Sequence, residues 1–532
     1  MCALAAAATT VAGGWQGISS EDLLAGLANP SRWLMYSGDY SGQRHSPLTQ
    51  ITPTNAARLT AQWTFQTGLP GKFEATPIVV DGVLYVTGLR NTAWAIDGRT
   101  GRQIGRYQRE LPQDLRLCCG PVNRGFAIHG DRLFMATLDA HLVALDRNTA
   151  KVVWDVEMGD HTQGYSATVA PLVVKDKVIV GISGGEYAIR GFIDAYDVNS
   201  GARLWRFYTV PAPGEPGSET WPSDALERGG APTWVTGSYD PQTNTIFWGT
   251  GNPSPDYFGE GRTGDNLYSN ALIALDADTG QLKWHFQFTP HDTHDWDATH
   301  VPVLARLPVG GTERDVVMVA NRNGFFYVLD RASGKFLHAT PYVKQTWAKE
   351  IGPDGRPVEI PDQRPSRRGT LTCPETHGAT NFMSPSYDPS LGLFFVNARE
   401  ACEVYFSQAP SADYKPGDRA MGGYSGPAPP PHTRTGALRA IDATTGERKW
   451  ELPFPSPSWA GVLSTAGGVV FSGTDEGDIV AAESRTGREL WRYSLGAPIY
   501  AAPITYMIDG RQYVALASGT TLTAFALPAN AP

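Results

Sequence analysis

The fold of this chain is decided by a phrase that stands as ALIALDADTGQLKW at residues 271–284. A short apolar strand ends in Asp276, a turn follows that ends in Thr279-Gly280, and the next strand begins with Trp284. Glycine supplies the positive φ that such a turn requires. The phrase therefore predicts a β-hairpin with a tryptophan at the entry of its second strand.

The phrase recurs at spacings of about 40–80 residues, which indicates a repeat architecture. The copies lie at Asp97–Gly101, Asp146–Trp154, Asp197–Trp205, Asp276–Trp284, Asp330–Gly334, Asp442–Trp450 and Thr486–Trp491. The gap between Asp330 and Asp442 has room for one more unit, around Asn381–Tyr405. Seven copies and the missing one predict an all-β, eight-bladed β-propeller with tryptophan-docking repeats.

The repeated tryptophans are expected to pack between blades rather than to bind a ligand. These are Trp154, Trp205, Trp284, Trp450 and Trp491, whereas Trp234 and Trp459 fall outside the phrase. Trp63 resembles a strand-entry tryptophan without its turn, which fits a ring closed by pairing of N- and C-terminal strands. Residues 15–532 are therefore expected to form a single propeller domain.

Residues 1–14 (MCALAAAATTVAGG) are small and apolar without a basic region, so we expect the remnant of an export signal or a disordered N-terminus. The remaining composition is turn-rich and aromatic, with 58 Gly, 40 Pro and 21 Tyr. The net charge of −9 argues against nucleic acid or an anionic membrane as partner. No apolar run has the length of a transmembrane segment, so none is expected.

Cys118 and Cys119 are adjacent in the stretch LCCGPVNRG (residues 117–125). Neighbouring Cα atoms lie about 3.8 Å apart, closer than an ordinary disulfide prefers, so a bond between them would be strained. Such strain clusters at functional sites and would indicate a ligand site. The alternative is a pair of ordinary buried free cysteines.

Polar residues follow several apolar strands and offer a set of oxygen ligands. Glu186, Asn252, Asp292, Asp295 and Asp297 supply carboxylate and amide oxygens, which suit a hard cation such as Ca²⁺. On a strand, Asp295 and Asp297 would point the same way and repel each other unless a cation lies between them.

A competing hypothesis uses the nearby histidines. His291, His294 and His300 could hold Zn²⁺ and activate a water molecule, which would make the protein a hydrolase. Their spacing matches no zinc motif with a clear physical basis.

Taken together, the motifs resemble those of the quinoprotein alcohol dehydrogenases, which use pyrroloquinoline quinone (PQQ) and include methanol dehydrogenase large subunits. The resemblance runs from Trp33 to near the C-terminus. The motifs that carry it are CCGPVNRG (118–125), GTGNP (249–253), TPHD…WD (289–297) and RNG (322–324). The resemblance implies an eight-bladed propeller that oxidises an alcohol to an aldehyde or ketone by hydride transfer to the quinone.

By this resemblance, a Cys118–Cys119 disulfide packs on one face of PQQ and Trp234 stacks on the other. The matching residues around the cofactor are Glu74, Arg124, Thr168, Ser183, Gly184, Gly185, Thr233, Asn381 and Trp459. The chain departs from many relatives in having Pro232 where they have threonine two residues before the tryptophan, so Thr233 is shifted by one position.

The resemblance also implies the metal ligands and the catalytic groups. Glu186, Asn252 and Asp295 match the ligand positions, and Asp295 also matches the general base. Arg322 matches an arginine that stabilises developing negative charge. Asp297 resembles the extra carboxylate of lanthanide-dependent members, which favours a lanthanide(III) ion over Ca²⁺.

Cys373 and Cys402 match a second family disulfide, and two disulfides predict an oxidising compartment, the periplasm. No Cys-x-x-Cys-His occurs, so we expect no fused haem and an external acceptor such as a soluble cytochrome c. A homodimer is compatible with the resemblance. The Pro/Gly-rich loop Ser411–Thr435 either covers the site or is mobile. The alternative function is a non-catalytic propeller scaffold for protein assembly, which would need none of the site residues.

Overall fold

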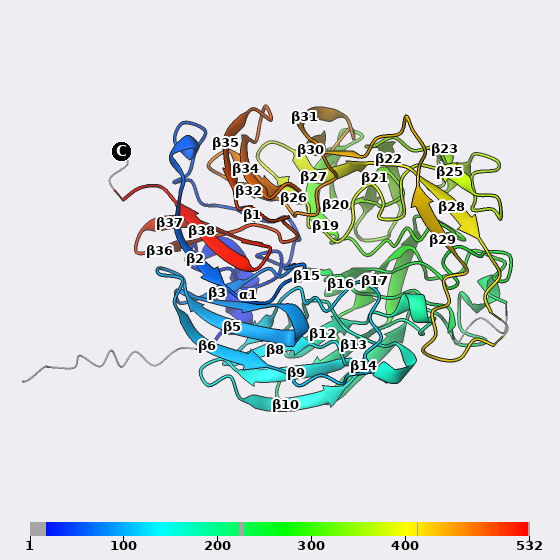
Figure 1. Cartoon of the computed structure of the whole chain (residues 1–532), viewed down its shortest axis with the longest axis horizontal. Coiled ribbons are helices and arrows are strands. Elements are labelled where there is room, and N and C mark those ends of the chain that lie inside the picture. Colours follow the sequence, from blue (N-terminus) through cyan, green and yellow to red (C-terminus); the bar gives the residue numbers. More distant parts are fainter. Residues whose placement is uncertain (1–16, 223–227, 412, 530–532) are drawn as a thin grey trace, which may run out of the picture.

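The computed structural model describes residues 17–222, 228–411 and 413–529, and these residues form mainly β-strands arranged around a ring (Figure 1). Residues 1–14, expected to be a signal remnant or a disordered terminus, lie outside the described residues. The described helices are all short. They are α1 (Ser20–Ala25), η1 (Gly26–Ala28), η2 (Ala56–Arg58), η3 (Leu89–Asn91), η4 (His161–Gln163), η5 (Gly185–Tyr187) and η6 (Ser218–Thr220).

Within the described residues, eight sheets have four or five strands each, the same number as the predicted blades. The first four are β3 (Ile78–Val80), β4 (Val83–Thr87), β5 (Thr92–Asp97), β6 (Gln103–Gln108); β7 (Ala127–His129), β8 (Arg132–Ala136), β9 (His141–Asp146), β10 (Val152–Glu157); β11 (Leu172–Val174), β12 (Lys177–Gly181), β13 (Phe192–Asp197), β14 (Arg203–Tyr208); and β15 (Ser238–Asp240), β16 (Thr245–Gly249), β17 (Ala271–Asp276), β18 (Leu282–Gln287).

The other four sheets are β19 (Val303–Val309), β20 (Thr312–Ala320), β21 (Phe325–Asp330), β22 (Phe336–Pro341); β26 (Ser386–Asp388), β27 (Leu393–Glu400), β30 (Thr435–Asp442), β31 (Arg448–Phe454); β32 (Leu463–Thr465), β33 (Val469–Gly473), β34 (Asp478–Glu483), β35 (Glu489–Ser494) with β1 (His45–Ser46); and β36 (Ile504–Ile508), β37 (Arg511–Ser518), β38 (Thr521–Ala526) with β2 (Thr60–Gln66). The predicted all-β propeller class is confirmed.

The last of these sheets joins the two ends of the chain. β2 pairs antiparallel with β38, in register from Thr60↔Ala526 to Gln66↔Thr521. Figure 1 shows the N-terminal β2 beside the C-terminal β38. The closure predicted from Trp63 is therefore confirmed, and it removes the free edges that an open ring would have.

Most tryptophans of the repeat dock on the turn of the next sheet. Trp284 Nε1 donates a hydrogen bond to the carbonyl oxygen of Arg331, at 3.2 Å. Equivalent bonds to the next turn are made by Trp63, Trp154, Trp205 and Trp450. Trp491 instead contacts Phe525 of β38, with ring centroids 5.1 Å apart. The predicted packing of these tryptophans between blades is confirmed.

The turn itself is held by its aspartate. Asp276 Oδ1 accepts hydrogen bonds from the backbone N–H of Asp278 and from both the N–H and hydroxyl of Thr279. Gly280 follows with φ +70°, and a Cβ there would lie 2.6 Å from the Trp205 ring of the preceding sheet. Glycine is thus required twice, for its backbone conformation and for the space that the tryptophan occupies.

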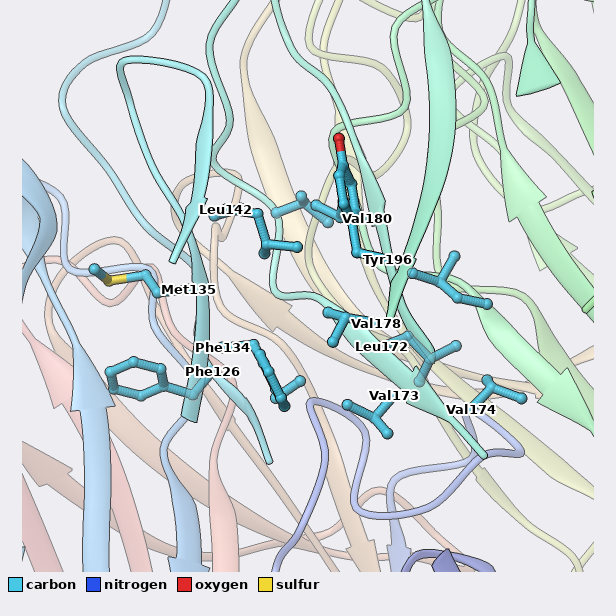
Figure 2. Close-up of a cluster of buried hydrophobic side chains, with 14 of the residues drawn as sticks. Phe126, Phe134, Met135, Leu142, Leu172, Val173, Val174, Val178, Val180 and Tyr196 are labelled. Carbon is cyan, nitrogen blue, oxygen red and sulfur yellow. The ribbon is translucent and has the colours of Figure 1, made fainter. Parts of the chain in front are cut away.

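The core lies between adjacent sheets. Inner strands are buried on both faces, whereas outermost strands such as β18 alternate between exposed and half-buried side chains. Figure 2 shows one such interface, where Phe134 and Leu142 of one sheet face Val178 and Val180 of the next.

The long gap between repeats contains the missing unit and an insertion. β26 and β27 begin the missing sheet where it was predicted, and β30 and β31 complete it. The insertion forms two small sheets, β23 (Ala348–Ile351) with β24 (Pro357–Glu359), and β25 (Thr370–Thr372) with β28 (Glu403–Ser407) and β29 (Gly423–Pro427). The predicted Cys373–Cys402 disulfide is present and ties this insertion to the end of β27. No helix of the described residues is long and apolar enough to cross a membrane.

We predict that Gly280→Ala destabilises the protein more than Gly392→Ala does. Both glycines have positive φ, +70° and +65°, but a Cβ at Gly392 meets nothing within 4 Å. The positive φ should cost each variant about 1–2 kcal/mol, and the clash with Trp205 should cost Gly280→Ala about 1–3 kcal/mol more. Urea unfolding measures both, and equal losses would contradict the second role of the glycine.

Candidate active site

A cavity of about 300 Å³ collects side chains from loops of many sheets. It is lined by the following residues predicted from the sequence: Glu74, Cys118, Cys119, Arg124, Thr168, Ser183, Gly184, Glu186, Trp234, Asn252, Asp295, Asp297, Arg322, Asn381 and Trp459. Some of these lie in connections between sheets, such as Cys118 between β6 and β7, and others lie between strands of one sheet, such as Asn252 after β16. The ring brings both kinds of loop together at one site.

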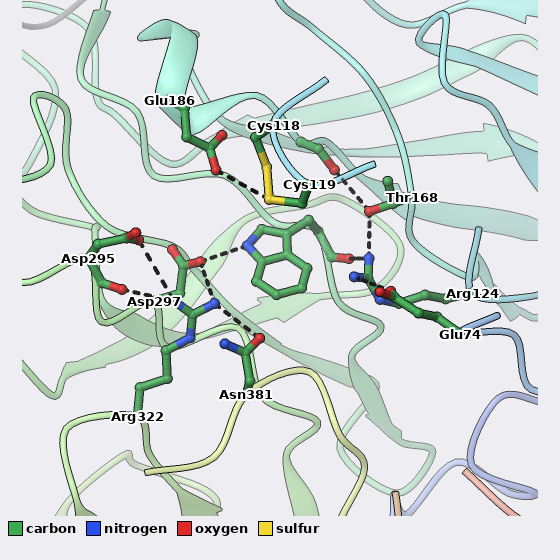
Figure 3. Close-up of a disulfide and its surroundings, with 12 residues drawn as sticks. Glu74, Cys118, Cys119, Arg124, Thr168, Glu186, Asp295, Asp297, Arg322 and Asn381 are labelled. Carbon is green, nitrogen blue, oxygen red and sulfur yellow. Dashed lines mark hydrogen bonds and ion pairs between the residues drawn. A yellow bond between two sulfur atoms is a disulfide. The ribbon is translucent and has the colours of Figure 1, made fainter. Parts of the chain in front are cut away.

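The adjacent cysteines are joined by a disulfide between Cys118 and Cys119, so the alternative of two free cysteines is wrong. Cys119 Sγ lies 3.9 Å from Glu186 Oε1. In Figure 3 the disulfide lies between Glu186 on one side and Thr168 and Arg124 on the other. The sulfur pair therefore forms part of the cavity wall, between Glu186 and Arg124.

The Trp234 indole is fixed at its polar edge and flanked by two cations. Its Nε1 donates to Asp297 Oδ2 at 2.9 Å. The guanidinium carbons of Arg124 and Arg322 lie 4.7 and 5.5 Å from the ring centroid. These contacts hold the ring in one orientation at the cavity.

One end of the cavity carries four oxygen-bearing residues, which we call the oxygen cluster: Glu186, Asn252, Asp295 and Asp297. Asp297 is the best anchored, because its Oδ1 accepts from the Asn252 backbone N–H at 2.7 Å. Asp295 has φ +60°, a conformation that non-glycine residues rarely adopt and that is found at functional sites. Arg322 lies 3.2 Å from Asp297 Oδ2 and 3.7 Å from Asp295 Oδ1 (Figure 3).

The electrostatics of this cluster favour a bound cation. Loss of hydration raises the pKa of Glu186, Asp295 and Asp297, and the neighbouring carboxylates raise the pKa of Glu186 and Asp295 further. Arg322 opposes the effect on all three but brings only one positive charge. Buried carboxylates that raise one another's pKa are stabilised by a cation, which removes both the repulsion and the cost of burial.

The opposite end of the cavity carries a buried ion pair and hydroxyl groups. Arg124 lies 2.7 Å from Glu74 Oε2 and donates to Thr168 Oγ1 at 2.6 Å. The Ser183 hydroxyl lies 3.2 Å from that of Thr168. Burial raises the pKa of Glu74, and the Arg124 charge opposes that rise. This end offers charged and neutral donors to an anionic group.

Two predicted cofactor residues do not line the cavity. Gly185 lies in η5, and its chain neighbours Gly184 and Glu186 line the cavity in its place. Thr233 is fully buried, and its hydroxyl accepts from the Ile182 N–H at 2.9 Å and donates to the Phe192 carbonyl at 2.6 Å. Its predicted cofactor contact needs correction, because this hydroxyl is buried and bonds to the backbone of a neighbouring sheet.

In the described part of the chain, the three histidines of the zinc hypothesis do not form a group that could hold a metal ion. None of them lines the cavity. His291 Nδ1 lies 2.9 Å from the Gly264 carbonyl oxygen, and His294 stacks on Trp296 with ring centroids 4.2 Å apart. Burial lowers the pKa of His300 to about 3. The zinc-hydrolase interpretation is wrong for this site.

Sequence reasoning missed several residues of the cavity wall. Tyr257 Oη lies 3.5 Å from Asp295 Oδ2, and Lys72 Nζ lies 5.7 Å from the Trp459 ring centroid. Tyr257 follows the GTGNP motif by only four residues, so its position was an available signal. The position of Lys72 near Glu74 gave a weaker one.

The loop between Ser411 and Thr435 covers the cavity, which answers the question that the sequence left open. We call residues 413–422 the cover segment. Its Ala420 N–H donates to the Glu186 carbonyl at 2.8 Å, and its Met421 carbonyl accepts from the Tyr257 N–H at 2.8 Å. Arg419 and Met421 line the cavity. These backbone bonds connect the cover directly to the oxygen cluster.

Comparison with known proteins identifies the family to which this chain is related. A family model described as PQQ: Glucose/ethanol/alcohol dehydrogenase, beta-propeller domain, matches residues 33–345 and 451–514. Over 529 residues the chain is 39% identical to the quinoprotein alcohol dehydrogenase PedH of Pseudomonas putida KT2440, covering 94% of this chain and 88% of that protein. It is 37% identical to the lanthanide-dependent methanol dehydrogenase of Methylacidiphilum fumariolicum SolV, covering 94% and 87%.

Solved structures of such enzymes have a similar fold. A europium-containing methanol dehydrogenase superimposes with a TM-score of 0.89 at 33% identity and covers 95% of this chain and 100% of its own. The quinohemoprotein alcohol dehydrogenase of Comamonas testosteroni superimposes with a TM-score of 0.91 at 33% identity, covering 97% and 83%.

The electrostatics predict that Glu186→Gln stabilises the metal-free protein increasingly as pH rises. The pKa of Glu186 is raised in the folded state, so the wild type loses stability above the ordinary glutamate pKa, and the Gln variant escapes this loss. Each unit of difference in pKa between folded and unfolded states contributes about 1.4 kcal/mol. Urea unfolding with chelator at pH 5 and pH 8 measures the change.

The matched control is Glu476→Gln, which removes an exposed carboxylate outside the cavity. It should shift stability little at either pH. A Glu186→Gln variant that is less stable than wild type at pH 8 would show that the carboxylate is favourably placed without a cation.

Proposed function

Since the chain belongs to the PQQ-dependent quinoprotein alcohol dehydrogenases, we propose that its cavity oxidises an alcohol with PQQ and a lanthanide(III) ion. The protein is a quinoprotein alcohol dehydrogenase, and the oxidation of an alcohol to an aldehyde or ketone follows from that. The observation that carries the proposal for the site is the joint presence of the Cys118–Cys119 disulfide, Trp234 and the oxygen cluster in one cavity.

The residues present fit PQQ. The disulfide and the Trp234 indole offer two surfaces for a flat ring, which dispersion and desolvation would hold. Arg124, Thr168 and Ser183 offer donors for its carboxylates. When bound, PQQ supplies the quinone that accepts a hydride from the alcohol carbon.

The residues also fit a hard cation. Glu186, Asn252, Asp295 and Asp297 offer only oxygen donors, which such ions prefer. Asp297 lines the cavity instead of pointing away from it, so its charge acts on the site. We propose a lanthanide(III) ion over Ca²⁺, because three carboxylates balance a trivalent ion better than a divalent one.

The chain's own residues then have distinct roles. We propose that Asp295 takes the proton of the substrate hydroxyl, and that Tyr257 at 3.5 Å helps to orient its carboxylate. Arg322 donates to the Asp295 carbonyl oxygen at 2.8 Å and so presents a fixed positive charge where negative charge develops. The cover segment, bonded to the Glu186 backbone, limits the access of water to the cavity.

We propose export to the periplasm and a soluble cytochrome c as electron acceptor. The two disulfides support an oxidising compartment. The net charge of −9 favours a basic protein as partner.

The direct test is dye-linked alcohol oxidation by the PQQ-reconstituted protein, with Ca²⁺ in one arm and La³⁺ in the other, across a small panel of alcohols. We expect activity that requires PQQ and is higher with La³⁺. Protein without PQQ is the control. No activity in either arm, with no quinone absorbance retained after desalting, would overturn the proposed site.

We predict that Asp297→Ala loses La³⁺-supported activity by about 10–100-fold while keeping part of any Ca²⁺-supported activity, since it removes charge from the trivalent ion. Asp418→Ala, which removes an exposed aspartate of the cover segment, should keep the wild-type preference. Steady-state rates at saturating metal decide the question. Undiminished La³⁺ activity in the Asp297 variant would refute the role of that residue.

A further inference from the structure

The loop that carries Asn252 of the oxygen cluster also carries a carboxylate, Asp256, that the proposed mechanism does not use. Asp256 follows Asn252 by four residues and immediately precedes Tyr257, and both of these neighbours line the cavity. Asp256 is only 1% exposed. Neither of its carboxylate oxygens has a hydrogen-bond partner within normal geometry. A buried carboxylate without partners is costly, so its presence requires a compensating group.

The loop that carries Asp256 is fixed on three sides. The Asn252 N–H donates to Asp297, the Ser254 N–H donates to the Gly229 carbonyl at 2.9 Å, and the Tyr257 N–H donates to the cover segment. The backbone of the loop between Asn252 and Tyr257 therefore holds Asp256 in place, without help from its own side chain.

The charge of the Asp256 carboxylate acts on the charges of the oxygen cluster. Burial, followed by the Glu186 carboxylate, raises the pKa of Asp256 well above its ordinary value, while the Asn252 side chain opposes the rise. After burial, Asp256 is the group that most raises the pKa of Asp295. Asp256 and the carboxylates of the cluster thus share one poorly hydrated space.

The protein's own cations do not balance this charge. Among the described residues, Arg322 is the only cation within ion-pair distance of Glu186, Asp256, Asp295 or Asp297. Arg262 favours the charged form of Asp256, but its guanidinium donates to the Pro255 and Asp292 carbonyls and to Asn266. Arg419 acts on Glu186 from beyond that distance. Four carboxylates against one arginine leave a formal charge of −3, which a trivalent cation would cancel.

We propose that Asp256 supplies a fourth carboxylate to the metal centre and that its charge helps to select a trivalent over a divalent cation. This inference rests on the proposed function of the oxygen cluster as a metal site. It adds to the predicted ligand set a residue whose chain position gave no sign of that role.

The test measures metal binding directly. Full-length protein loaded with PQQ is dialysed to equilibrium against buffered La³⁺ or Ca²⁺, and the bound metal is determined by elemental mass spectrometry. We expect Asp256→Asn to bind La³⁺ about 10–100-fold more weakly and to lose less Ca²⁺ affinity, so that the La³⁺/Ca²⁺ preference falls. Asp354→Asn is the matched control, because it removes one exposed negative charge outside the cavity, and it should bind as wild type.

A second measurement keeps the inference testable if binding is difficult to compare. In the metal-free protein, Asp256→Asn should raise the melting temperature, because it removes an unpartnered buried carboxylate. Addition of La³⁺ should then raise the melting temperature of this variant by less than it raises that of the wild type. A variant with lower metal-free stability and an unchanged La³⁺ shift would overturn the proposal.

The outcomes separate this inference from the proposed function. If wild-type protein retains neither metal, the metal site itself fails, and the inference fails with it. If wild type binds La³⁺ and Asp297→Asn weakens binding while Asp256→Asn does not, only the inference about Asp256 is overturned.

Discussion

Pairing of the N-terminal strand β2 with the C-terminal strand β38 is the constraint on which the remaining structure depends. It closes the ring, so each sheet has a neighbour on both faces and each docking tryptophan has a turn to bond. Closure also fixes the site, since the cavity is lined by residues from Lys72 to Trp459. No single sheet could assemble this site, because its two faces and its two polar ends come from loops that only the closed ring brings together.

The cavity combines two environments that would be unfavourable if left empty of ligand. At one end, Asp295 and Asp297 share Arg322, and the raised pKa values of Glu186, Asp295 and Asp297 show the cost of burying them. Between the ends, a disulfide and an indole present apolar surface to the cavity. A cation and a flat anionic ring together satisfy both environments. The stability of the site is therefore coupled to its ligands, as expected when binding occurs only to the folded state.

Much of the fold could be predicted from the sequence, because the repeat couples a local turn to a long-range contact. Asp276, Gly280 and Trp284 each mark a recurring feature: the turn, its glycine and the docking tryptophan. The spacing of the repeat alone predicts the sheet that lies between Asp330 and Asp442. The site was predicted mainly through family motifs, and the structure places most of those residues at the cavity. Thr233 is an exception, because its hydroxyl bonds to backbone groups of a neighbouring sheet. The sequence does not decide whether the Ser411–Thr435 loop covers the site, and it does not indicate Asp256, because both depend on contacts between distant loops that no local pattern records.

The decisive experiment locates the cation by anomalous X-ray scattering in crystals of the protein loaded with PQQ and La³⁺. The account predicts one strong anomalous peak within coordination distance of Glu186, Asn252, Asp295 and Asp297, next to a quinone held between Cys118–Cys119 and Trp234. A peak elsewhere, or a quinone bound outside this cavity, would contradict it.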